Sequence, residues 1–259
     1  MNRTFPLLAL LTSSLALAGV SPAEIQESWA ADAALRRSLG RYGAQLTGED
    51  FATLARGDVV ARIVRGQAGD RILGAVYTAA PLEAMWISVH DVAHRDSDDG
   101  VIYRELPGSF GTRQVLYTLA DAPWPLEDRQ SLVDIRFNRA LYEQSEGRVW
   151  ERTWTTADPA LMRDPDPEAL WMPTNEGSWQ MVRVGGGALA VLSLRVHAGG
   201  SVPDEVGLRW GLMTLDSLLE GMAAFAEQMP SHYQGGHFAM ARPDGTYIPL
   251  GSFTAAATP

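Results

Sequence analysis

Two histidines, His90 and His94, lie four residues apart in a stretch with helical spacing, and two imidazoles at this spacing can bind one metal ion. The only further candidate ligand nearby in the sequence is Asp91. The chain has no cysteine, which removes thiolate ligands, disulfides and thiol nucleophiles. Two histidines on a helix surface before a polar loop are the simpler interpretation, so we predict no metal site and no cofactor.

The sequence contains neither a motif for a catalytic nucleophile nor a well-placed general acid or base. Residues 108–111 (GSFG) lack the glycine spacing of a nucleophile elbow, and the glycines at 185–187 join two predicted strands rather than a strand and a helix. Asp134, Glu151 and His197 are the only acid–base candidates on predicted strands, and each lies opposite the apolar parity of its strand. We therefore predict no catalytic residue.

Two arginines have surroundings that call for an explanation. Arg136 lies in mid-strand among apolar residues, where it either points inward as a buried charge that needs a partner or a ligand head group, or points outward into solvent. Arg129 follows a turn, and we interpret it as the ion-pair partner of Asp128 or Glu127 at the entry to that strand.

Composition restricts the possible partners. The 259 residues are 46% hydrophobic and carry a net charge of −10, from 31 acidic and 21 basic side chains. An acidic chain without a basic cluster argues against nucleic acid and against tight electrostatic docking on anionic lipid.

The first residues have the pattern of a cleavable secretory signal. Arg3 precedes an apolar run, and small residues at Ala16 and Ala18 match a cleavage motif. We expect a signal peptide at 1–18, cleavage after Ala18, and a periplasmic or extracellular protein. The alternative is an uncleaved membrane anchor, for which the run is short and interrupted by polar residues at 12–14.

The elements that would position any site are predicted from periodicity. A stripe of apolar residues over 201–229 predicts one long helix with a single buried face, formed by Leu208, Leu212, Leu215, Leu219, Met222 and Ala226. Val206, Trp210 and Met213 lie opposite this stripe, so we expect a loop to cover the first half of the helix. Short helices are expected in 21–43, after Thr47, and from Pro81.

Short strand-like runs fill the rest of the chain, at 59–64, 71–78, 101–106, 114–119, 131–139, 148–155, 179–184 and 188–197. About eight antiparallel strands with one long helix to cover them should curl around that helix, in an α+β fold that leaves space for a ligand. We assign 19–45 to an N-terminal helical segment, 46–229 to the ligand-binding domain and 230–259 to a flexible C-terminal tail.

Candidate cavity residues come from the strands and the long helix. They are Tyr103, Tyr117, Arg136, Trp154, Trp179, Met181, Leu194 and Leu212. An acidic, proline-rich loop over 158–175 carries Trp171 and Met172, which are candidates for a lid or a membrane-contacting lip. For the tyrosines, tryptophans and Met181, an ordinary core position is the competing interpretation.

Four stretches, in order, resemble the START family of steroidogenic-acute-regulatory-protein-related lipid transfer domains in its bacterial form. They are GDVV at 57–60 with APLEAMW at 80–86, DAPWPLEDR at 121–129, EGSW at 176–179 and GGSVP at 199–203. The resemblance extends over 46–229. It implies a helix-grip fold, as in the wider Bet v 1-like superfamily, in which a curved antiparallel sheet wraps a long C-terminal helix around a cavity for one lipid.

The resemblance also implies a function. We expect an exported, non-enzymatic protein that binds, and possibly transfers, a lipid or other apolar small molecule, with transient membrane contact. The sequence departs from the family in two respects. It carries an export signal, whereas members are commonly intracellular, and it differs at the polar end of the cavity. Members with sterol specificity tend to have a buried arginine–carboxylate pair, whereas here Arg136 has no carboxylate on the strand before it. The alternatives are a polyketide cyclase or aromatase using the same cavity, and an interaction module without a ligand.

Overall fold

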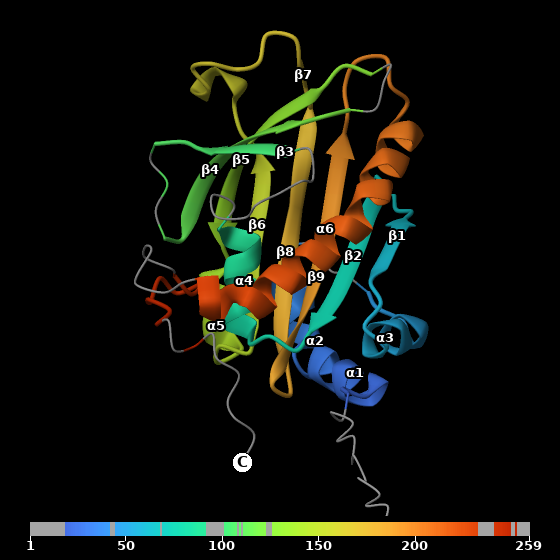
Figure 1. Cartoon of the computed structure of the whole chain (residues 1–259), viewed down its shortest axis with the longest axis vertical. Helices are drawn as coiled ribbons and strands as arrows, with labels where there is room; N and C mark the ends of the chain where they lie inside the picture. Colours follow the sequence, from blue (N-terminus) through green and yellow to red (C-terminus); the bar gives the residue numbers. More distant parts are fainter. Residues whose placement is uncertain are drawn as a thin grey trace, which may run out of the picture.

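One curved sheet wraps around a long C-terminal helix (Figure 1). The structure, a computed structural model, describes residues 19–41, 45–67, 69–91, 101–107, 109, 111–122, 126–232, 241–249 and 252. Within these residues the sheet has nine strands in the order β1-β2-β9-β8-β6-β5-β4-β3, and β7 pairs with β5 off this path. Every pairing is antiparallel except that of β7 with β5. The predicted α+β helix-grip fold is confirmed.

The strands are β1 (Val60–Val64), β2 (Arg71–Thr78), β3 (Val101–Glu105), β4 (Arg113–Ala120), β5 (Arg129–Phe137), β6 (Val149–Thr156), β7 (Leu170–Trp171), β8 (Thr174–Val184) and β9 (Gly187–His197). The helices are α1 (Pro22–Ala31), α2 (Ala33–Leu39), α3 (Gly48–Ala55), α4 (Leu82–His90), α5 (Arg139–Gln144) and α6 (Asp204–His232), with a 3-10 turn at Pro159–Leu161. The sequence did not predict α5 or β7, and it placed the start of β8 five residues too late.

The long helix α6 crosses the inner face of the sheet, where it packs on β1, β2, β9 and α4 (Figure 1). Its predicted stripe is buried, except that Leu212 is only half-buried. Gly74 on β2 permits the close approach, because a Cβ there would lie 3.0 Å from a methyl carbon of Leu215 and 3.2 Å from one of Leu219. Val206 and Met213 are 44% and 81% exposed, so the expected covering loop does not bury them.

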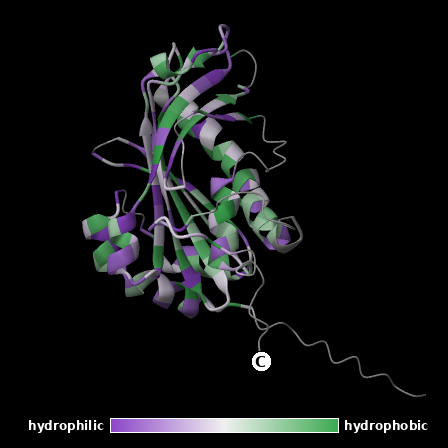
Figure 2. Cartoon of the chain, turned by 90° about the vertical axis from the view of Figure 1, so that its left-hand side faces the viewer, coloured by the Kyte–Doolittle hydropathy of each residue, from purple (hydrophilic) through white to green (hydrophobic). Residues whose placement is uncertain are grey.

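Both faces of the sheet are covered, and apolar and polar residues alternate along the strands (Figure 2). The main core lies between the inner face, α4 and α6. A second core forms where α1 and α3 pack on the outer face, around Ile25, Trp29, Phe51 and Leu54. Residues 22–39 therefore pack against the sheet of the predicted ligand-binding domain. The predicted signal peptide at 1–18 lies outside the described residues.

Part of the C-terminal tail is packed. Trp86 of α4 is fully buried, and its indole N–H donates to the Ala241 carbonyl oxygen at 3.0 Å. Ala241 pairs with Tyr247 in an isolated bridge, and Ile248 is fully buried. The prediction of a flexible tail from residue 230 is therefore wrong for 241–249, and α6 itself continues to His232.

Arg129 connects two of the stretches that carry the family resemblance. Its buried guanidinium donates to the backbone carbonyl oxygens of Ala198 (2.7 Å), Asp128 (3.3 Å) and Glu127. The start of β5 is thereby tied to the turn that leads into α6. The predicted ion pair of Arg129 with a neighbouring carboxylate is replaced by bonds to backbone oxygens.

Candidate functional site

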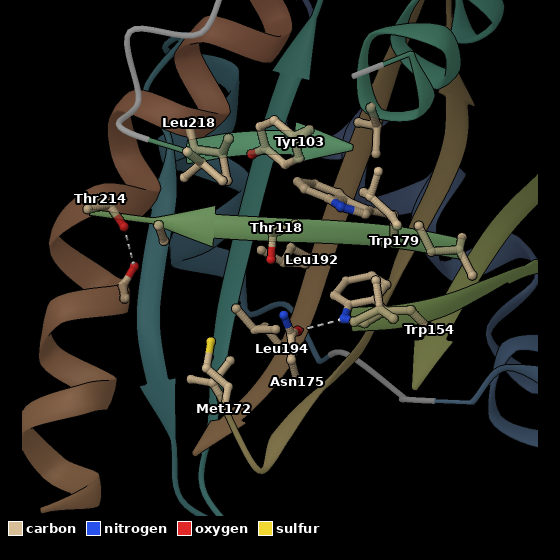
Figure 3. Close-up of a pocket in the computed structure, with 18 of the residues that line it drawn as sticks. Tyr103, Thr118, Trp154, Met172, Asn175, Trp179, Leu192, Leu194, Thr214 and Leu218 are labelled. Atoms are coloured by element: carbon tan, nitrogen blue, oxygen red, sulfur yellow. Dashed lines mark hydrogen bonds between the residues drawn. The ribbon is translucent and has the colours of Figure 1, made fainter. Parts of the chain in front are cut away.

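A cavity of about 280 Å³ lies between the curled half of the sheet and α6 (Figure 3). Its walls are formed mainly by apolar side chains from β3 to β6, β8 and β9, and α6 closes one side with Gly207, Gly211, Thr214, Leu218 and Met222. The α6 residues lie at spacings of four and three beside the stripe that packs on the sheet, so one helix serves both the core and the cavity. Gly207 and Gly211 let α6 approach the sheet closely, because a Cβ at 211 would lie 2.7 Å from a methyl carbon of Ile72 and a Cβ at 207 would lie 3.2 Å from the Ala198 Cβ.

A chain of satisfied hydrogen bonds runs along one wall. The Trp154 indole N–H donates to Asn175 Oδ1 at 2.9 Å, and Asn175 Nδ2 donates to the Ser131 hydroxyl oxygen at 2.9 Å (Figure 3). That hydroxyl is 2.6 Å from the Thr118 hydroxyl. The wall is thus polar at fixed points, and these polar side chains hydrogen-bond to one another.

Gly177 shapes the same wall. A Cβ at this position would lie 2.5 Å from the Trp154 ring and 2.4 Å from the Ser193 carbonyl oxygen. Any side chain there would displace the Trp154 ring. This glycine belongs to EGSW, one of the stretches that resemble the START family, and its role in the cavity is to place Trp154.

The cavity is open at one end and closed at the other. Asp121, just past β4, lines the cavity and is exposed, whereas Arg152 of β6 lines it and is only 5% exposed. Beyond Arg152 lie the end of α4 and buried polar groups. The Gln114 amide contacts the His90 carbonyl oxygen at 3.5 Å, and the His90 ring packs edge-on against Phe137 with the centroids 4.8 Å apart. Burial, and then the charge of Arg152, lower the pKa of His90 to about 3.

Five of the ten predicted cavity and lid residues line the cavity: Tyr103, Trp154, Trp179, Leu194 and Met172. Met181 is fully buried in the main core, and Leu212 packs half-buried against that core, but neither lines the cavity. Both face inward as predicted. Met181 lies on β8, which contacts α4, and Leu212 lies on α6, which packs on β1, β2 and β9, so both belong to the packed core beside the cavity.

Arg136 points to the outer face of the sheet. Its side chain is 66% exposed and donates to Asp134 Oδ2 at 3.0 Å, and Arg113 binds the same carboxylate through two hydrogen bonds of 3.0 Å. Val133, Ile135 and Phe137 of β5 lie on the inner face. Because successive side chains of a strand point to opposite faces, Arg136 points outward. The hypothesis of a head-group contact therefore does not hold for this arginine.

Tyr117 and Trp171 also lie on the outer face. Their rings are in edge contact at 6.2 Å, and the Tyr117 hydroxyl donates to Gln130 Oε1 at 2.9 Å. They belong to a third apolar cluster, with Val115 and Leu132, that the proline-rich loop covers. Trp171 is thus a packing residue of this loop, while its neighbour Met172 reaches the cavity.

The acid–base candidates do not line the cavity. Asp134 lies on the outer face as described, and His197 is exposed at the end of β9 with Nδ1 accepting from the Gly199 N–H at 3.0 Å. Glu151 is fully buried on the outer side of β6, where it accepts from Asn138, Gln180 and the Arg41 N–H, and burial raises its pKa. Among the described residues that line the cavity, the charged ones are Asp121 and Arg152.

The part of the chain that the structure describes bears on the metal-site and membrane-anchor alternatives. It contains no group of three or more His, Asp or Glu placed to hold a metal ion, and His94 lies outside it. The Ser109 hydroxyl donates to the Leu106 carbonyl oxygen and accepts from the Val115 N–H, which makes it a turn residue. No described helix combines the length and the apolarity needed to cross a bilayer.

Sequence reasoning missed several cavity residues: Thr118, Arg152, Asn175, Gly207, Gly211 and Thr214. A signal existed for Arg152, because it lies two residues from both Trp150 and Trp154 on a predicted strand and therefore shares their inward face. A signal existed also for Gly207, Gly211 and Thr214, which follow helical spacing. Nothing in the sequence indicated Asn175, since the structure begins β8 earlier than the pattern did.

Comparison with known proteins gives similarity in structure. No protein-family model and no curated protein matches the sequence. Human StAR-related lipid transfer protein 5 matches with a TM-score of 0.56 at 14% identity, over 80% of this chain and 97% of that chain. The STAR-related lipid transfer protein from Xanthomonas axonopodis matches with 0.53 at 20%, over 64% and 90%. Human STARD10 matches with 0.52 at 14%, over 74% and 85%. The chain therefore has the helix-grip fold of the START lipid-transfer domains.

Proposed function

We propose that this protein binds one lipid or other apolar small molecule in the cavity between the sheet and α6. The observation that carries the proposal is the cavity itself, which is about 280 Å³ in volume and mainly apolar in its walls. Ligand pockets of this kind, with a few fixed polar groups, are typical of small-molecule binding. Two of the three structural neighbours are named as lipid transfer proteins, which supports an apolar cargo.

Binding draws on the hydrophobic effect. A ligand that buries about 300 Å² of hydrocarbon gains about 7 kcal/mol, at about 25 cal/mol per Å², before the costs of ordering. This gain is relative to water, so it holds the ligand in the cavity against release into water, while exchange with a membrane is nearly balanced because the hydrocarbon is buried in both places.

Transfer to and from a membrane would take place at the open end. Met172 and Trp210 line the cavity there, and the exposed Val206 and Met213 share one side of α6 with Trp210, at spacings of four and three. Apolar groups beside a cavity mouth are placed to contact a bilayer while cargo passes. We assign the membrane-contacting role, first considered for Trp171, to these residues.

The proposal includes export. The capping box between Ser21 and Glu24 starts α1 directly after the expected cleavage point at Ala18. Removal of 1–18 would therefore leave the first helix intact. N-terminal sequencing of protein from the exported fraction tests this; a mature chain that begins at Gly19 supports export, and an intact N-terminus contradicts it.

An enzymatic function in the same cavity is less well supported. A cyclase would need a general acid or base beside its substrate. The three candidates in the sequence lie elsewhere, as described above, and Asp121 is at the exposed rim.

The test is native mass spectrometry of the purified protein, followed by organic extraction of any adduct. The proposal predicts one reproducible adduct of small-molecule mass. Thr214→Trp should abolish it, because Thr214 lines the cavity from an exposed helix position. The matched control is Ser217→Trp, on an exposed position of the same helix that does not line the cavity. A wild-type protein that carries no adduct and takes up no offered lipid would overturn the proposal.

A further inference from the structure

A threonine of the cavity wall stands at the end of the hydrogen-bond chain described above. Thr118 lies on the inner face of β4 and lines the cavity, as Leu116 and Ala120 of the same strand do (Figure 3). Asp121 at the open rim is three residues further along the chain, or about 10 Å at the rise of an antiparallel strand. The Thr118 hydroxyl therefore lies well below the rim, in a cavity whose walls are mainly apolar.

The direction of the hydrogen bonds follows from the groups that make them. An indole nitrogen donates and cannot accept, so the Asn175 amide turns its oxygen to Trp154 and its nitrogen to Ser131. Ser131 is fully buried and pairs with Thr118 across the two strands. Among the described residues, the partners of the Ser131 hydroxyl are the Asn175 N–H, which donates to it, and the Thr118 oxygen at 2.6 Å. Ser131 must therefore donate to Thr118, since a buried hydroxyl that donates to nothing is costly.

The Thr118 proton is then left for the cavity. The Thr118 oxygen accepts from Ser131, and no described residue accepts from the Thr118 hydroxyl in turn. Successive bonds that run in one direction polarise one another, which makes the last hydroxyl a better donor. Thr214 lines the same cavity but differs, because its hydroxyl already donates to the Gly211 carbonyl oxygen at 3.2 Å. The wall thus offers a neutral hydrogen-bond donor at Thr118.

The volume limits the size of the ligand. An apolar cavity of about 150 Å³ binds benzene, so a cavity of this kind with nearly twice that volume accommodates about a dozen carbon atoms. The cavity measures about 280 Å³. One chain or two small rings fit this space, whereas a two-chain lipid does not.

We propose that Thr118 determines specificity by donating a hydrogen bond to an oxygen inside the hydrocarbon part of the ligand, and that this ligand is an uncharged carbonyl compound of about a dozen carbons. The inference rests on the proposed function and specifies its ligand class. A ketone or ester oxygen accepts a hydrogen bond and brings no proton of its own, whereas a ligand hydroxyl would need an acceptor in an apolar wall.

A purely structural role for the Thr118 hydroxyl makes a different prediction. If this hydroxyl served only to accept from Ser131 and hold the wall in place, its loss would weaken the binding of all ligands alike. Loss of a ligand contact would weaken only a ligand that has the matching oxygen. Two probes that differ in this one atom therefore separate the two roles.

The experiment measures, by tryptophan fluorescence, the affinity of the ligand-free protein for undecan-6-one and for 6-methylideneundecane, in which a CH₂ group replaces the oxygen. The ratio of the two affinities is the ketone preference. Thr118→Val should lower this preference about fivefold, the factor that corresponds to a typical neutral hydrogen bond. A folded Thr118→Val protein with the wild-type preference would overturn the inference and leave the proposed function standing. A wild-type protein that binds neither probe would overturn both.

Two further variants test the assignment to the hydroxyl. Thr118→Ser retains the donor and should keep the ketone preference. Thr153→Val is the matched control, because Thr153 lies on β6 outside the cavity lining and its hydroxyl donates to the Arg136 carbonyl oxygen at 3.4 Å. It should keep the full preference, and a loss as large as that of Thr118→Val would overturn the assignment to Thr118.

Infrared spectroscopy of the bound ketone keeps the inference testable if Thr118→Val does not fold. A carbonyl that accepts a hydrogen bond absorbs at a lower frequency than the same ketone in hexane. The inference predicts this lower frequency for undecan-6-one bound to the wild type. A C=O stretch at the hexane value would overturn the inference, while the binding itself would still support the proposed function.

Discussion

Acid should destabilise this protein through His90. The ring is 2% exposed, lies against Trp86 and Phe137, and its Nδ1 has no hydrogen-bond partner among the described residues. Burial and the neighbouring Arg152 lower its pKa from 6.5 to about 3. The folded state thus keeps His90 neutral at a pH where the unfolded chain takes up a proton. This contribution to stability is complete above pH 6.5 and is lost as the pH falls toward 3.

The magnitude follows from the size of the pH step. Between pH 7 and pH 5 the unfolded histidine becomes protonated while the folded one does not, which costs about 2 kcal/mol at about 1.4 kcal/mol per pH unit below 6.5. His90→Phe keeps an aromatic ring in the cluster and removes the titration. Urea unfolding at the two pH values should therefore show wild type losing about 2 kcal/mol more than this variant.

Other titrating groups are shared by the two proteins and cancel in the comparison. Equal losses in wild type and in His90→Phe would refute the reasoning, since they would mean that His90 is protonated to the same extent in both states.

Two further predictions concern packing and the cavity mouth. Trp86→Ala should lower the free energy of unfolding by about 3–5 kcal/mol and Trp86→Phe by about 1–3 kcal/mol, because phenylalanine keeps most of the packing but leaves the buried Ala241 carbonyl oxygen without its donor. Urea titration measures both, and a Trp86→Phe variant as stable as wild type would contradict the packed position of 241–249. Met213→Ser should leave stability unchanged and slow the extraction of a fluorescent lipid from vesicles, since Met213 is 81% exposed near the mouth. Trp171→Ala should lower the stability and leave the rate of lipid extraction unchanged. Equal transfer rates in wild type and Met213→Ser would contradict the proposed membrane contact of Met213.

Much of the fold could be predicted because the two faces of several elements differ in polarity. Alternation along the strands predicts that Val133 and Ile135 share one face of β5 and that Leu192 lies on the apolar face of β9, and the structure shows that both are the inner face. The helical spacing of α6 identified its buried stripe for the same reason. The long-range result, a sheet that curls around this helix, followed from having many strands and one long helix to cover them.

The site was predicted less completely, for physical reasons that differ between residues. Both faces of β4 are covered, so the apolar pattern around Tyr117 carried no information on which face meets the cavity. Arg152 shares one strand face with two tryptophans, Trp150 and Trp154. Hydropathy alone nevertheless gives no reason to place a charged side chain in an apolar wall. The short α5 and β7 have too few residues for a period, and 241–249 packs through a few contacts without any periodicity.

The measurement that tests the central claim most directly is a crystal structure of the protein with a terminally brominated dodecanol, in which anomalous scattering locates the bromine. The account predicts one bromine site inside the cavity that Trp154, Trp179 and Thr214 line. Bromine bound only on the outer surface, or a saturated crystal with no bromine between the sheet and α6, would contradict it.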